Sequence, residues 1–284
     1  MENEEFVNQS KYSIKESLNL KDKIAVITGG AGLLGEKHAE AINEFGGTSV
    51  LLDINKDKAL INAENVVKKY GSSSIALECD ITNQKSLENV NSKILELFGK
   101  VDILINNAAN NPKVEGKFIN NRLESFSLEE WNKDINVGLT GAFLCSKVFG
   151  KTMAMKNSGN ILNIASDLAL IAPDQRIYLK SNLESHNQPV KPISYSVIKS
   201  GLIGMTRYIA TYWIKEGVRC NALLPGGVEN NQNEEFVEKL SNLIPMGRMA
   251  NSNEYKGAIA FLVSNASSYM NGALLSIDGG RTAW

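Results

Sequence analysis

The sequence is poor in cysteine and histidine, the side chains that build disulfide frameworks and zinc sites. Its 284 residues include three cysteines, Cys79, Cys145 and Cys220, and two histidines, His38 and His186. The cysteines are too far apart for a CxxC redox pair, and no carboxylate cluster at ligand spacing accompanies the histidines. We therefore expect no disulfide framework and no metal site.

The sequence also lacks an excess of either charge and any long apolar run. Lysine and arginine number 30, aspartate and glutamate 31, so the formal net charge is -1, while 43% of residues are hydrophobic. A nucleic-acid binder needs a basic excess, and a membrane span needs about 18 apolar residues in a row. Met1 to Leu20 has charged side chains and no apolar signal-peptide core. We expect a folded cytoplasmic protein with no nucleic-acid or membrane partner.

What the sequence does contain is a regular alternation of short apolar runs and longer amphipathic stretches. The runs, which predict strands, cover residues 23–28, 48–53, 74–79, 101–106, 160–165, 218–224 and 273–277. The stretches, which predict helices, cover about 33–45, 56–70, 83–98, 128–157, 194–215 and 253–264. Continuous apolar strands are buried on both faces, as in a parallel sheet covered by helices. The sequence predicts an α/β fold of the Rossmann type, a doubly wound parallel sheet of about seven strands with helices on both faces. It forms one domain over 20–284, after an N-terminal arm over 1–19.

Two predicted connections are longer than the loops of a compact domain usually are. Residues 110–128 follow the fourth strand and residues 167–193 follow the fifth, at the strand ends where open α/β sheets bind ligands. We expect these loops to set substrate specificity; a subunit contact is the alternative for the second. In that loop Arg176, Lys180 and Lys191 are candidates for pairing with a phosphate or carboxylate, or else are ordinary solvated charges.

The first predicted strand runs into a glycine-rich turn that opens a helix. Residues 28–35 read TGGAGLLG, in which Gly30, Gly32 and Gly35 have the GxGxxG spacing of a dinucleotide-binding turn. Glycine lets the backbone approach a pyrophosphate held at the helix N-terminus. The next strand ends at Asp53, 18 residues after Gly35, where a carboxylate binds the ribose hydroxyls and repels a 2′-phosphate. This predicts NAD rather than NADP, unless Asp53 is only a solvated acid at a strand end.

Tyr195 and Lys199 are four residues apart in a predicted helix, so their side chains lie on one face. An ammonium close to a phenol stabilises the phenolate and lowers its pKa from about 10 toward the range of a general acid–base. The spacing alone also occurs in helices that have no catalytic role.

Together with other motifs, this pair resembles the short-chain dehydrogenase/reductase family, from about residue 20 to residue 284. The matching segments are Asp80-Ile81 after the third strand, Asn106-Asn107-Ala108-Ala109 after the fourth, Ser166 after the fifth and Pro225-Gly226-Gly227-Val228 after the sixth. The resemblance implies hydride transfer between a nicotinamide and a carbinol carbon. It makes Tyr195 the general acid–base, Lys199 the group that lowers its pKa and binds the nicotinamide ribose, and Ser166 the group that orients the substrate oxygen. The implied cofactor contacts are Gly29, Gly32, Leu33, Leu34, Gly35, Asp53, Asp80, Ile81, Asn107, Ala108, Tyr195, Lys199, Pro225, Gly226 and Val228.

The glycine spacing departs from the single-domain pattern of that family. Gly29, Gly32 and Gly35 also fit TGxxGxxG, the spacing of the family's two-lobed nucleotide-sugar epimerases and dehydratases. Only 89 residues follow Tyr195, which is too few for a second lobe. We therefore expect the single-domain type.

Two further departures concern the catalytic centre. Gly138 stands where the family has an asparagine that holds a relay water, and we expect the relay to work through Gly138 or through a loop side chain. Ser166 and Tyr195 are 29 residues apart, about twice the usual interval, because the second long loop lies between them.

The polar composition of both long loops favours a small polar polyol, sugar or sugar phosphate as substrate. Residues 192–199, PISYSVIK, resemble a subgroup of bacterial proteins labelled flagellin modification protein A, which implies a role in surface-glycan synthesis. The alternatives are a nucleotide-sugar epimerase or dehydratase, a 3-ketoacyl-thioester reductase and a non-catalytic NAD-binding scaffold. The family also implies a homodimer or homotetramer.

Overall fold

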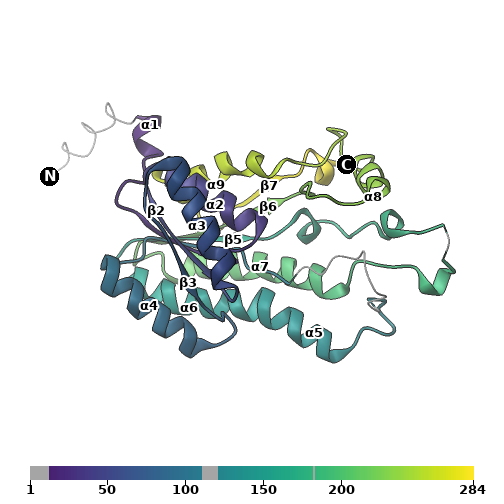
Figure 1. Ribbon diagram of the computed structural model, residues 1–284, viewed down its shortest axis with the longest axis horizontal. Coiled ribbons are helices and arrows are strands. Elements are labelled where there is room, and N and C mark those ends of the chain that lie inside the picture. Colours follow the sequence, from purple (N-terminus) through teal and green to yellow (C-terminus); the bar gives the residue numbers. More distant parts are fainter. Residues whose placement is uncertain (1–12, 111–120, 182) are drawn as a thin grey trace.

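One seven-stranded parallel sheet forms the centre of the computed structural model, which describes residues 13–110, 121–181 and 183–284 (Figure 1). The strands are β1 (Ile24–Thr28), β2 (Thr48–Asp53), β3 (Ser74–Glu78), β4 (Ile103–Asn106), β5 (Gly159–Ile164), β6 (Val218–Pro225) and β7 (Leu274–Ile277). Their order across the sheet is β3-β2-β1-β4-β5-β6-β7, and each neighbouring pair is parallel. The predicted doubly wound fold is confirmed, and every predicted strand lies within two residues of its predicted bounds.

Helices cover both faces of the sheet. One face carries α2 (Leu33–Glu44), α3 (Lys56–Tyr70) and α9 (Lys256–Val263), and the other carries α4 (Gln84–Phe98), α6 (Gly141–Met155) and α7 (Ile193–Tyr212). Because the strands lie between two helical layers, apolar residues pack on both of their sides, and β1 is buried at every residue. This double burial is the reason the strands appear in the sequence as unbroken apolar runs.

The sequence marks the ends of two of these helices. The side chains of Asn55 and Asn83 cap α3 and α4 by accepting backbone N–H groups of the first turn. Both helices end at a glycine in the left-handed conformation, Gly71 with φ of 70° and Gly99 with φ of 73°.

The helix predicted over 128–157 is present, but it is not uniform. A π-helical turn, Asn136–Thr140, joins α5 (Leu128–Ile135) to α6 and contains Gly138. Such turns inside α-helices occur frequently at functional sites. The structure also has an eight-residue helix that the sequence pattern did not predict, α8 (Glu234–Ser241), which begins after the N-cap Asn233.

Several predicted segments lie partly outside the described residues. Residues 1–12 of the predicted arm and 111–120 of the first long loop are among them, so both segments stay predictions; the described part of the arm contains α1 (Ile14–Ser17). In the described part of 167–193 the chain forms short 3-10 turns. Of the helices within the described ranges, none has the length and apolar character needed to cross a membrane.

Candidate active site

The predicted site residues come together at the carboxyl edge of the sheet. The strand order reverses between β1 and β4, the point where doubly wound sheets form a ligand-binding crevice. The glycine turn follows β1, and the Asn107-Ala108 turn follows β4. These turns pack tightly, because a Cβ on Gly29 would lie 2.9 Å from the Cα of Ala108. Gly29 also has a φ of +68°, a conformation that favours glycine.

The start of α2 has the features of a pyrophosphate site. Gly32 is the N-cap, and no side chain within the described residues caps the helix there. Gly32 and Leu33 are exposed, and Leu34 follows half-buried. Uncapped N–H groups at a helix N-terminus bind anions. A Cβ on Gly35 would overlap the carbonyl oxygen of Gly29, so Gly35 lets the helix start against the turn. These residues fit the pyrophosphate of a dinucleotide.

Gly35→Ala is expected to weaken NADH binding at least tenfold and to lower stability by about 1–3 kcal/mol, the usual cost of overpacking. The overlap with Gly29 is with backbone, so the turn itself has to move. Fluorescence titration with NADH and thermal unfolding measure both effects. Gly204→Ala is the matched control, because a Cβ there meets nothing within 4 Å; equal effects of the two variants would contradict the packing argument.

Asp53 ends β2 beside the glycine turn. Its Oδ2 accepts the N–H of Ala31 at 3.0 Å and its Oδ1 accepts the N–H of Asn55 at 2.9 Å, so the carboxylate is held in one orientation. Each carboxylate oxygen has a second lone pair, and these can accept the two ribose hydroxyls. The position fits an adenosine ribose rather than a freely solvated acid.

Asn107 fastens the end of β4 to the glycine turn. Its backbone N–H donates to the Thr28 hydroxyl at 3.0 Å, and its side-chain Nδ2 donates to the Thr28 carbonyl at 2.9 Å. Its Oδ1 lies 3.2 Å from Nε2 of His38, a residue for which the sequence suggested no role. Burial lowers the pKa of His38 to about 4, so this histidine is a neutral part of the core under the turn.

The other predicted cofactor residues follow the same edge. Asp80 is exposed after β3, and Ile81 beside it is buried. Pro225 is the last residue of β6, and Gly226 and Val228 lie in the turn after it. The positions therefore follow the carboxyl edge of the sheet from β3 to β6.

Ser166, Tyr195 and Lys199 meet near the end of β5. Ser166 is the N-cap of the 3-10 turn after this strand, and Tyr195 and Lys199 lie one turn apart at the start of α7. The side chain of Ser166 is near enough to the Tyr195 hydroxyl to lower the pKa of that phenol. The Nζ of Lys199 lies 5.6 Å from the centre of the Tyr195 ring and donates to the Ile164 carbonyl at 2.8 Å. The long interval between Ser166 and Tyr195 therefore does not separate them.

Burial controls the protonation of this cluster. It raises the pKa of Tyr195 above the ordinary value, and the neighbouring Ser166 side chain offsets only part of this effect. The expected lowering by Lys199 is therefore not the dominant influence. Burial also lowers the pKa of Lys199 to about 8, assisted by repulsion from Lys191.

Lys191 is the loop cation that reaches the cluster. Its Nζ lies 3.8 Å from the centre of the Tyr195 ring. Burial lowers the pKa of Lys191 to about 8, against two nearby carboxylates that act to raise it. The other two candidate cations of this loop lie at the surface, Arg176 in an ion pair and 81% exposed, and Lys180 exposed. Lys191 is thus the cation of the three that faces Tyr195.

Asp134 is a buried carboxylate that the sequence analysis missed. It lies on α5, one turn before Gly138, and is 4% exposed. It accepts the hydroxyl of Ser194 at 2.5 Å and the side-chain amide of Asn110 at 2.7 Å. Ser194 directly precedes Tyr195, so Asp134 fixes the start of α7. The sequence does not show which side of α5 faces the interior, so it does not distinguish Asp134 from the exposed acids of this helix.

Asp167 and Arg281 form a buried ion pair that holds the Ser166 side chain in place. Arg281 donates from Nη1 to Asp167 at 2.9 Å, and the two side chains are 7% and 4% exposed. The other oxygen of Asp167 accepts the Ser166 hydroxyl at 2.7 Å. Arg281 is 114 residues away in the sequence, so no local pattern signals this pair.

Gly138→Asn tests whether the missing asparagine matters. A Cβ at Gly138 would lie 2.7 Å from Cγ2 of Ile198, so the larger side chain has to displace Ile198. We expect a loss of about 1–3 kcal/mol in the free energy of unfolding and no gain in kcat, measured by chemical denaturation and steady-state kinetics. A hundredfold rise in rate would contradict the expectation that the native proton relay is adequate.

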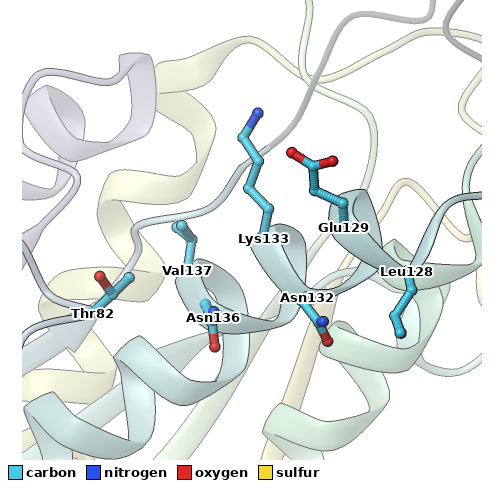
Figure 2. A pocket seen from close by; sticks show the side chains of 7 residues that line it. All are labelled: Thr82, Leu128, Glu129, Asn132, Lys133, Asn136 and Val137. Carbon is cyan, nitrogen blue, oxygen red and sulfur yellow. The ribbon is translucent and has the colours of Figure 1, made fainter.

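Two cavities are candidates for the substrate site. One, of about 360 Å³, is beside the cluster, and its lining includes Arg122, Gln175, Lys191 and Ser196. The other, of about 650 Å³, lies along α5 and is lined by residues such as Glu129 and Lys133, whose side chains extend from the same side of the helix (Figure 2). Ser166, Tyr195 and Lys199 line neither cavity, but Lys191, whose ammonium lies over the Tyr195 ring, lines the first. The first cavity is therefore the better candidate for the substrate.

A parallel sheet, a glycine turn at its switch point and a Tyr-x-x-x-Lys pair at the same edge define a Rossmann-type oxidoreductase that uses a dinucleotide.

A family profile described as enoyl-(acyl carrier protein) reductase matches residues 30–282. The NAD-dependent glycerol dehydrogenase of Listeria innocua is 31% identical over 272 residues, which are 94% of this chain and 96% of that protein. The NADP-dependent mannitol dehydrogenase of Alternaria alternata is 30% identical over 94% of this chain and 95% of that protein. The crystal structure of gox2181 is 27% identical with a TM-score of 0.84, covering 96% of this chain and 100% of that one.

The chain belongs to the short-chain dehydrogenase/reductase family, as its motifs predicted. The likeness to the flagellin modification subgroup stays a prediction.

Proposed function

We propose that this protein is an NAD-dependent dehydrogenase that interconverts a secondary alcohol and a ketone on a small polyol or sugar. The observation that carries the proposal is the cluster at the end of β5, where Ser166 neighbours Tyr195 and the Nζ of Lys199, one turn further along α7, lies 5.6 Å from the centre of the Tyr195 ring. This cluster shares its sheet edge with the glycine turn that fits a pyrophosphate.

In the proposed reaction Tyr195 is the general acid–base. In oxidation it takes the proton of the substrate hydroxyl, and in reduction it returns that proton. Ser166 orients the substrate oxygen, and Lys199 is placed to bind the nicotinamide ribose and to support the negative charge on Tyr195. Bound NAD supplies the acceptor for the hydride that leaves the carbinol carbon.

NAD rather than NADP is the proposed cofactor. Asp53 supports this, because its fixed carboxylate would repel a 2′-phosphate. The turn over residues 29–35 contains no arginine or lysine that could pair with that phosphate. The names of the two relatives include both cofactors, so the proposal rests on Asp53.

A polyol or sugar is the proposed substrate. The relatives are named for glycerol and mannitol, and the cavity beside the cluster has polar and cationic lining residues, Gln175, Arg122 and Lys191 among them. Because Arg122 and Lys191 can pair with an anionic group, a phosphorylated or carboxylated sugar is included among the proposed substrates. The role in surface-glycan synthesis stays a prediction.

A substrate panel tests the proposal. Neutral polyols, their phosphates and the corresponding sugar acids are incubated with NAD or NADP, and NAD(P)H absorbance and sugar consumption are followed together. NADH formed with one polyol or sugar supports the dehydrogenase. Sugar consumed without net NADH would indicate an epimerase or dehydratase, and NADPH-dependent reduction of a ketoacyl thioester would indicate that reductase. No turnover of any compound would favour the NAD-binding scaffold.

A homodimer or homotetramer is part of the proposal. Large side chains lie exposed on α6 and α7, with Phe143 52%, Tyr208 66% and Tyr212 60% exposed. Exposed apolar groups of this size are typical of protein–protein contact surfaces.

A further inference from the structure

Lys191 contacts the candidate general base more closely than the lysine of the sequence motif does. Its Nζ lies 3.8 Å from the centre of the Tyr195 ring, against 5.6 Å for the Nζ of Lys199. The ammonium of Lys199 is meanwhile engaged by the Ile164 carbonyl. Lys191, near the end of the loop between Ser166 and Tyr195, is thus a second cation over the phenol ring.

The surroundings of Tyr195 make such a cation necessary for ionisation. The Tyr195 side chain is half-buried, and this loss of solvent disfavours the charged phenolate. Asp167 also faces it and opposes a negative charge there, although Arg281 neutralises much of this carboxylate through the buried ion pair. Tyr178 faces the ring from the same loop. Burial, Asp167 and Tyr178 therefore oppose the phenolate, and the Ser166 side chain offsets only part of their effect.

Cations are the groups that do favour the phenolate. An ammonium over an aromatic ring is attracted to its π face, and the attraction grows when the ring oxygen ionises because the ring then carries a full negative charge. Asp134 and Asp167 face Lys191 from α5 and from the turn after β5. These carboxylates favour the charged form of Lys191, whose side chain is half-buried.

We propose that Lys191 is a positioning residue whose ammonium, seated on the Tyr195 ring, stabilises the phenolate that accepts the substrate proton. The inference rests on the proposed function for the role of Tyr195 in turnover. Lys199 then contributes mainly through the cofactor ribose and the Ile164 carbonyl. The second long loop has a part in the chemistry as well as in the shape of the substrate cavity.

The sign of the expected effect follows from the charge. Oxidation requires the phenolate, so kcat/KM rises with pH through the pKa of Tyr195. A cation within about 4–6 Å lowers the pKa of an acid by about 1–3 units. Removing the ammonium therefore moves the rising limb of kcat/KM to higher pH. At a pH below the Tyr195 pKa, each unit by which this pKa rises lowers kcat/KM tenfold.

The test compares Lys191→Met with Lys191→Arg and with Lys180→Met, an exposed lysine of the same loop. The pH profile of kcat/KM is measured with NAD and a neutral polyol, mannitol or glycerol. We expect Lys191→Met to shift the rising limb upward by at least one unit, and Lys191→Arg and Lys180→Met to leave it in place. If the rising limb of Lys191→Met stayed at the wild-type pH, the proposal would be overturned. It would also be overturned if the only effect of Lys191→Met were a higher KM for phosphorylated or carboxylated sugars, because Lys191 would then bind substrate and not act on Tyr195.

A second measurement separates this proposal from the proposed function. The ultraviolet absorbance of ionised phenol is titrated in the wild-type protein and in Tyr195→Phe, and the difference reports Tyr195 without any substrate. The same titration in Lys191→Met should place the Tyr195 pKa at least one unit higher. An unchanged titration would refute the role of Lys191 even if the protein turned over no polyol. If Lys191→Met failed to fold by circular dichroism, Lys191→Gln would replace it in both measurements.

Discussion

Tyr195→Phe is expected to lower kcat for polyol oxidation by about 10²–10⁴-fold, the usual contribution of a general acid–base. The variant keeps the ring that packs against Lys191 and removes only the hydroxyl, so the change is chemical rather than structural. NADH formation gives the rate, and fluorescence titration with NADH gives the cofactor affinity, which should stay within about twofold of the wild type.

Tyr208→Phe is the matched control for that variant. Tyr208 lies on the same helix, but it is 66% exposed, so losing its hydroxyl should change neither rate nor affinity. Turnover in Tyr195→Phe at the wild-type rate would contradict the assignment of the general base. Loss of NADH binding would show instead that the substitution had disturbed the fold of the site.

Asp53→Asn is expected to reverse or abolish the preference for NAD over NADP. Hydrogen bonds to a charged group contribute about 1.5–3 kcal/mol, so kcat/KM with NAD should fall by roughly 10–150-fold. The rate with NADP should rise, because the repulsion of the 2′-phosphate is removed. The amide keeps an oxygen for the N–H of Ala31 or Asn55, so the turn stays in place. Steady-state kinetics with both cofactors measure the ratio.

Asp57→Asn removes the same charge from an exposed position in the first turn of α3 and controls for the change in net charge. Its cofactor ratio should match that of the wild type. A wild-type protein that prefers NADP, or an Asp53→Asn variant with an unchanged ratio, would show that Asp53 is the solvated strand-end acid that the sequence left as the alternative.

Much of the fold could be predicted from the sequence because its signals are local. The strands are buried on both faces, so each is an unbroken apolar run, and the turn at Gly29 requires a residue without a side chain beside Ala108. The positions of Tyr195 and Lys199 on one helix face follow from helical spacing alone. For the same reason the predicted family and fold are correct, while α8, with only eight residues, gave too short a pattern to detect.

The parts that could not be predicted depend on tertiary contacts. Which cation of the second loop faces Tyr195 is decided by the path of residues 167–193, and composition does not encode that path. The rise in the pKa of Tyr195 arises from burial, whereas the sequence showed only the nearby Lys199. Asp134 and Asp167 acquire their roles from partners on other elements.

The ion pair between Arg281 and Asp167 also sets an order of assembly. A ribosome makes the chain from the N-terminus, and domains begin to fold during synthesis. The glycine turn, Asp53 and the β1–β4 crevice all precede the second loop in the chain, whereas the predicted cofactor contacts Pro225, Gly226 and Val228 follow it. Ser166 acquires its buried anchor only when β7 and Arg281 have been added. A nascent chain that stops short of Arg281 is therefore expected to lack the anchored Ser166 and to turn over no substrate.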